Sequence, residues 1–121
     1  MGIGALGRVE PASRILRISA PLGAEPPRND EQQQALMLSL QRSLPELRSF
    51  ALLAPSGAMI SDSAADSQDA AWLAELVQRS RAQSYYLSNS NDGTLIYLLL
   101  HQPSGGSRMY WALRLAPNYL S

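Results

Sequence analysis

The most informative hydrophobic pattern lies at residues 95–100, in the first strand of a predicted hairpin near the end of the sequence. A strand with one face in water alternates apolar and polar residues. This segment instead has Ile96, Leu98 and Leu100 on one side and Leu95, Tyr97 and Leu99 on the other. Such two-sided apolarity predicts the central strand of a sheet that is covered by helices on both faces.

Two segments in the first third of the chain have helical character. Residues 14–20 predict a short helix capped by Ser13, although their isoleucine content also permits a strand. Residues 30–43 predict a longer helix with one apolar stripe. Asp30 begins this helix, with Gln33 as its capping-box partner. Pro45 disfavours helical angles at Leu44, so we expect the helix to end near Ser43. The stripe consists of Leu36, Met37, Leu40, Leu44 and Leu47.

The rest of the chain predicts a hairpin, a third helix and a three-stranded meander. Residues 48–54 and 58–61 are strands joined by a Pro-Ser-Gly turn. A helix over 67–82 buries Trp72, Leu73, Leu76 and Val77. The meander consists of strand 84–88, a turn at 89–93, and two strands joined by a turn at 103–106.

This order of elements predicts an α+β fold with a five-stranded antiparallel sheet and helices on both faces. The PAS, GAF, roadblock and profilin-like folds share the order. We expect residues 1–12 to be a mobile leader and residues 13–121 to form one domain, which a chain of 121 residues suits.

Several stretches resemble GAF domains. The opening "SRILRISAPLGAEPPRNDEQQQALMLSLQRSLPELRSFALLAPSG" is similar to their first helices and first strand, and "AAWLAELVQRSRAQSYYLSN" is similar to a helix that precedes a short strand. "YLLLHQPSGGSRMYWALRLAP" resembles their paired late strands. The resemblance implies a sensory or regulatory module of a bacterial signalling protein. Residues 82–93 are short compared with the segments that roof a GAF ligand pocket, so we expect no cofactor.

The composition of the chain excludes several classes of function and of binding site. The formal net charge is zero, so no overall field attracts nucleic acid. The chain has no Cys and one His, which excludes thiol catalysis, disulfides and multi-histidine metal sites. It also has no apolar run near the roughly 20 residues of a membrane span. We therefore expect a protein without metal, nucleic-acid contact or direct membrane insertion. The resemblance to a signalling module implies that it is cytoplasmic.

A few residues suggest chemistry, but none defines a catalytic site, and we expect no enzyme. His101 could be a lone metal or haem ligand, but a rim position near a strand end is the simpler interpretation. The carboxylates of Asp62, Asp66 and Asp69 lack a sequence partner that would complete an acid–base or metal site, so helix capping and loop solvation explain them better.

Four residues near the end of the sequence resemble a stacking platform for nucleic acid: Tyr97, Tyr110, Trp111 and Arg114. The sheet core explains Trp111 better, since it alternates in phase with Met109, Leu113 and Leu115. Tyr110 and Arg114 share the opposite phase and could face a helix, a second subunit or solvent.

The first helix gives a candidate interface. Ile15, Leu16 and Ile18 are too many apolar residues for one short helix to bury, so we expect them to form a homodimer contact. The alternative is that Ile15 and Ile18 fold back on their own domain. The expected function is non-enzymatic regulation, by dimerisation or by signal transmission to an attached or separate output domain. A roadblock-like interaction scaffold that partners a small GTPase is the alternative.

Overall fold

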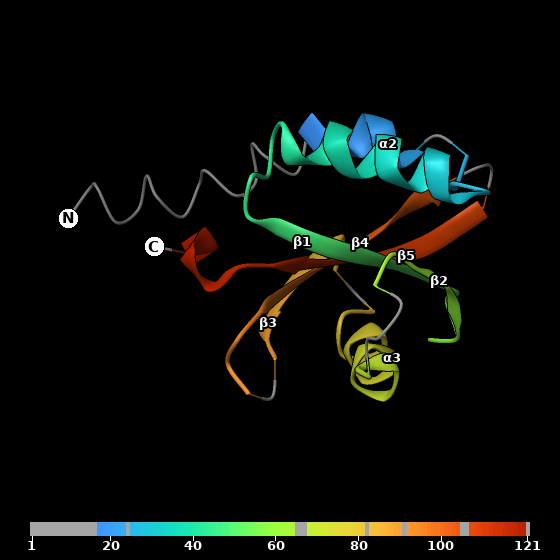
Figure 1. The fold of residues 1–121 in the computed structure, drawn as a ribbon. Helices are drawn as coiled ribbons and strands as arrows, with labels where there is room; N and C mark the ends of the chain where they lie inside the picture. Colours follow the sequence, from blue (N-terminus) through green and yellow to red (C-terminus); the bar gives the residue numbers. More distant parts are fainter. Residues whose placement is uncertain are drawn as a thin grey trace.

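The computed structural model describes residues 17–23, 25–64, 68–81, 83–90, 92–104 and 107–120. Its elements follow the predicted order (Figure 1). Helical residues 17–23 precede α2 (Asp30–Gln41), β1 (Leu47–Leu53), β2 (Met59–Asp62), α3 (Ala70–Arg79), β3 (Tyr85–Asn89), β4 (Ile96–Ser104), β5 (Ser107–Leu115) and the 3-10 helix η1 (Pro117–Leu120). The expected leader, residues 1–12, lies outside the described residues.

The five strands form one antiparallel sheet in the order β2-β1-β5-β4-β3. This arrangement confirms the predicted α+β fold class. The middle strand is β5, and the two-sided apolar strand is its neighbour β4. The hairpin β4–β5 is the longest pairing in the sheet and runs from the Ile96–Leu115 pair to the Ser104–Ser107 pair. The strands therefore extend into the 103–106 segment that the sequence predicted as a turn.

Both faces of the sheet are covered, as residues 95–100 predicted. Helix α2 and helical residues 17–23 lie on one face, and α3 lies on the other (Figure 1). The first core contains Ile18, Leu22, Leu40, Leu44, Leu47, Phe50, Leu52, Ile96, Leu98, Leu100, Trp111, Leu113, Leu115 and Tyr119. The second contains Ala51, Leu53, Leu73, Leu76, Val77, Tyr97, Leu99, Tyr110 and Ala112.

The helix boundaries differ from the predicted ones by a few residues. The cap of α2 is Asn29 rather than Asp30, since the Asn29 side chain accepts a hydrogen bond from the Gln32 backbone N–H at 2.8 Å. The first helix continues past Pro21 to residue 23. Leu22 explains this extension, because it lies one turn after Ile18 and both side chains are buried in the same core.

The β1–β2 turn also contacts α3. Gly57 has a φ of 95°, a left-handed conformation that favours glycine. A Cβ at this position would lie 3.2 Å from the Ala74 Cβ on α3. Glycine therefore permits both the turn and the close approach of the helix.

Replacement of Leu98 by Ala is expected to lower the free energy of unfolding by about 2–5 kcal/mol, because it opens a cavity in the first core. Leu98 is fully buried, whereas Leu38 on α2 is 54% exposed, so Leu38→Ala is the control and should change stability by less than about 0.5 kcal/mol. Urea unfolding measures both. A loss below about 1 kcal/mol for Leu98→Ala would contradict the packing described for this face.

Candidate functional site

A buried charged cluster lies between the sheet and α3. Its centre is Arg114 in the middle strand β5, whose side chain is 3% exposed. Two carboxylates flank the guanidinium: Asp62, at the end of β2, and Asp69, directly before α3. Three elements that are distant in sequence therefore meet at one cation.

All three nitrogen atoms of the Arg114 guanidinium donate hydrogen bonds within the cluster. Asp62 accepts two hydrogen bonds, from Nη1 at 2.9 Å and from Nη2 at 2.6 Å. Asp69 also accepts two, from Nε at 2.8 Å and from Nη2 at 2.9 Å. Nη1 donates a further bond to the Ser49 hydroxyl at 3.0 Å. Because Arg has five N–H donors, all of them are used inside the protein.

Strand register explains why these partners meet. Ser49 on β1 and Tyr97 on β4 are the cross-strand neighbours of Arg114 on the two sides of β5. Direct cross-strand neighbours place their side chains on the same face of the sheet. Ser49 reaches the guanidinium, while the Tyr97 hydroxyl donates to Asp69 at 2.7 Å. The cluster thus spans three strands, the end of β2 and the start of α3.

The electrostatics favour the charged forms. Burial alone would raise the pKa of Asp69, but hydrogen bonds from Arg114 and Tyr97 outweigh it and hold that pKa below its ordinary value of 3.8. Burial alone would lower the pKa of Arg114, and the two carboxylates raise it instead. Burial raises the pKa of the Tyr97 hydroxyl, and its hydrogen bond to Asp69 raises that pKa further. Asp69 and Arg114 therefore stay ionised at neutral pH.

This arrangement is suited to holding elements together. An anionic substrate would find no unused N–H on Arg114, and the Asp69 carboxylate is already shared between Arg114 and Tyr97. The position of Asp69 supports the same interpretation. It occupies the N-cap position of α3, yet its side chain makes no capping bond and binds the sheet instead.

The sequence analysis did not predict this cluster. The sequence suggests helix capping and loop solvation for the three carboxylates, but Asp62 and Asp69 pair with Arg114, and Asp66 lies outside the described residues. The available signal was Arg114 itself, a charged residue within the otherwise apolar and aromatic run of residues 109–115. The alternation along β5 correctly placed Arg114 on the face of the sheet opposite to that of Trp111. That face is the one covered by α3.

The stacking candidates are core residues. Tyr97, Tyr110 and Trp111 are each at most 3% exposed, which confirms the sheet-core interpretation of Trp111. The ring of Trp111 meets Phe50 edge to face, with centroids 5.7 Å apart.

His101 lies near the end of β4, where its ring stacks on Tyr110 with a centroid distance of 4.2 Å. Desolvation, together with the positive charge of Arg108, lowers its pKa, so the neutral ring is favoured. Within the described parts of the chain, no group of three or more His, Asp or Glu side chains is placed to hold a metal ion. Over the same parts, the helices are all too short or too polar to cross a membrane.

The expected dimer residues require a correction. Ile18 is 1% exposed and belongs to the core of its own domain, so it is not available to a partner. It can be buried because residues 17–23 lie beside α2 over the sheet, where Gln102 of β4 donates to the Ser19 carbonyl at 3.1 Å. Ile15 and Leu16 lie outside the described residues.

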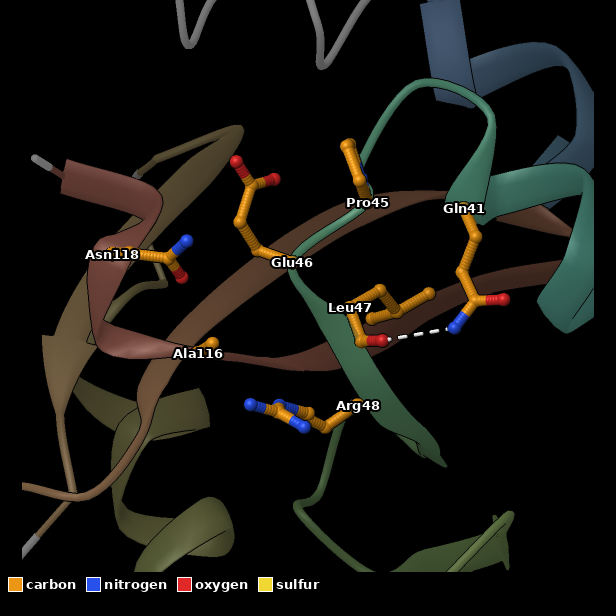
Figure 2. Close-up of a pocket in the computed structure, with 7 residues that line it drawn as sticks. All are labelled: Gln41, Pro45, Glu46, Leu47, Arg48, Ala116 and Asn118. Carbon is orange, nitrogen blue, oxygen red and sulfur yellow. Dashed lines mark hydrogen bonds between the residues drawn. The ribbon is translucent and has the colours of Figure 1, made fainter.

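An open hollow of about 570 Å³ lies where β1 begins, next to η1 (Figure 2). The charged side chains that line it do not converge on one point, since Glu46 and Arg48 point in different directions in Figure 2. Gln41 from the end of α2 donates to the Leu47 carbonyl at 3.1 Å. This side-chain bond satisfies a backbone acceptor at the start of β1 and connects the end of α2 to the sheet.

No protein-family model matches the chain, and neither a curated protein nor a solved structure is significantly similar to it. The resemblance to GAF domains therefore stays a prediction.

Replacement of Arg114 by Met is expected to lower the free energy of unfolding by about 3–5 kcal/mol, since it leaves two carboxylates without their cation. The triple variant Arg114→Met, Asp62→Leu, Asp69→Leu should recover most of that loss, because an apolar cluster has no charge to desolvate. Denaturant unfolding at neutral pH measures both. A single Arg114→Met change that costs less than about 1 kcal/mol would show that the cluster does not hold α3 in place.

The cluster also predicts a pH dependence. Asp69 has a folded-state pKa below 3.8, so its contribution to stability is present above that pH and is lost as the pH falls through the folded-state pKa. The stability difference between wild type and Asp69→Asn should therefore shrink on acidification below this value. Urea unfolding over a pH series measures it. A difference that stays constant down to the acid limit of the series would contradict the assignment.

Proposed function

We propose that the protein is a non-enzymatic regulatory module of a bacterial signalling protein, located in the cytoplasm, which acts through contacts with other proteins. The observation that carries the proposal is the β3 edge of the sheet. Both faces of the sheet are occupied by the chain's own helices, and the charged cluster uses its donors internally. What the sheet itself still offers for recognition is therefore its edges.

The two edges of the sheet differ in how well they are closed. β2 has four residues, and its pairing with β1 has a register shift between Leu52 and Leu53. The Ser63 hydroxyl then accepts from the Phe50 backbone N–H at 2.8 Å, beyond the end of β2. Short, irregular and side-chain-capped edges are poor templates for pairing with another chain.

β3 has the opposite character. Its sequence, Tyr85–Asn89, contains no charge and no proline, and its pairing with β4 runs without a register shift. Tyr85 is 41% exposed. Lys, Pro and bulges are the usual devices that prevent an edge strand from pairing with other chains, and β3 carries none of them. Such an edge supports recognition by addition of a strand.

Helix α3 extends this surface beyond the strand. Glu75 and Arg79 form an ion pair one turn apart and are each 51% exposed. The Arg79 guanidinium lies over the Trp72 ring, 5.3 Å from its centroid, and also interacts with Tyr86 of β3. These contacts place the exposed stripe of α3 beside β3. We call the β3 edge together with Trp72, Glu75 and Arg79 the β3–α3 surface.

A roadblock-like scaffold that partners a small GTPase is the second candidate function. It is favoured by the direct connection from α3 to β3, where a roofed ligand pocket would need additional helices or loops. Both candidates predict a protein partner at the β3–α3 surface. A signalling module additionally requires an output domain, attached or separate, to receive the signal.

Photo-crosslinking in cells tests the proposal. A benzoylphenylalanine residue in place of Tyr85 should crosslink to a defined protein, which mass spectrometry would identify. The control carries the same residue in place of Leu38, which is exposed on α2 at a distance from the edge. If position 85 crosslinks no more than position 38 does, the β3 edge is not an interaction surface and the proposal fails.

A further inference from the structure

We propose that the partner of the β3 edge is a second copy of this chain, with the two β3 strands paired antiparallel across a two-fold axis at Leu87. This inference rests on the proposed interaction function and specifies its partner. It replaces the first helix, whose Ile18 is buried, as the site of self-association.

The hydrogen bonds between β3 and β4 identify which backbone groups are free to pair. His101 N–H donates to the Ser84 carbonyl at 3.0 Å, and Ser90 N–H donates to the Leu95 carbonyl at 2.9 Å. Backbone groups of an antiparallel strand point alternately toward and away from a given neighbour. The backbone N–H and C=O groups of Tyr86 and Ser88 therefore point toward β4, like the backbone groups of residues 84 and 90.

The backbone N–H and C=O groups of Tyr85, Leu87 and Asn89 consequently point out of the sheet. Among the described residues, the contact made to these groups is a 3.3 Å bond from the Ser88 hydroxyl to the Asn89 carbonyl. The three residues are symmetric about Leu87. A two-fold axis there pairs Leu87 with the partner's Leu87 and Tyr85 with the partner's Asn89.

This register is also compatible with the side chains. Leu87 packs against the core on the α2 face, and Tyr85 shares that face because the two positions are two apart. The pairing sets two apolar Leu87 side chains side by side and gives the exposed Tyr85 a cross-strand neighbour. Both effects remove apolar surface from water.

Charge supports a second copy as the occupant. A two-fold axis brings like residues together, so a charged strand would repel itself. Residues 83–90 contain no charged side chain. A two-fold axis perpendicular to the sheet would also set the two α3 helices antiparallel on the same face. Glu75 and Arg79 of α3 form an ion pair within each copy, so the exposed pair beside the strand has no net charge that would repel its symmetry mate.

Light scattering on the purified 121-residue chain tests the proposal. The mass should rise with concentration from 13.2 kDa toward twice that value. Asn89→Pro removes an outward N–H and leaves the bonds to β4 intact, whereas Asn89→Ala removes the same side chain and keeps the N–H. Proline should weaken dimerisation about tenfold or more, and alanine by less than about threefold. A mass of 13.2 kDa up to millimolar concentration overturns the proposal, as does equal dimerisation of the two variants.

A disulfide test reports on the register independently of that comparison. The chain has no cysteine, so Leu87→Cys introduces a unique thiol that the two-fold axis places opposite its own copy. Paired residues on neighbouring strands have Cα atoms about 5.5 Å apart, within disulfide range. Mild oxidation should link Leu87→Cys much faster than the exposed control Leu38→Cys. Equal rates would overturn the proposed axis. If position 85 crosslinks to a different protein while these tests fail, the interaction function stands and self-pairing does not.

Discussion

The pairing of Arg114 with Asp62 and Asp69 is the interaction on which the rest of the structure depends. One guanidinium in the middle strand connects the end of β2 to the start of α3, the helix that crosses from one edge strand of the sheet to the other. The Asp69 side chain forgoes capping its own helix to make this contact. Because a buried cation without partners is costly, the cluster favours the one arrangement in which α3 covers the second face of the sheet.

Coverage of both faces was predictable from the sequence, and the cluster was not. Apolar side chains on both sides of β4 require two covering layers, and the leucine stripe of α2 and the Trp72–Val77 stripe of α3 supply them. Local patterns of this kind report on burial. The partners of Arg114 lie 45 and 52 residues away in sequence, so only the strand register and the crossover bring them together. The sequence left the burial of Ile18 as the alternative to a dimer contact for the same reason, since it depends on where the first helix docks.

A sheet with closed faces can still interact through its edges. The β2 edge is short and irregular, and side chains of Ser63 and Gln41 bind backbone groups of β1 near it. The β3 edge is regular and uncharged, and is flanked by the exposed stripe of α3. The Arg114–Asp69 pair, which fixes α3 on the sheet, and the unpaired β3 edge are therefore related. The same helix that completes the second core positions Glu75 and Arg79 beside that edge.

The most direct test of this account is residue-resolved amide hydrogen exchange in dilute and concentrated protein. In dilute solution Tyr86 and Ser88 should be protected by β4, while Tyr85, Leu87 and Asn89 exchange rapidly. At high concentration the latter three should become protected as β3 pairs with a second copy, and the first two should change little. Outward amides that are protected equally at every concentration, or that never become protected, would contradict the account.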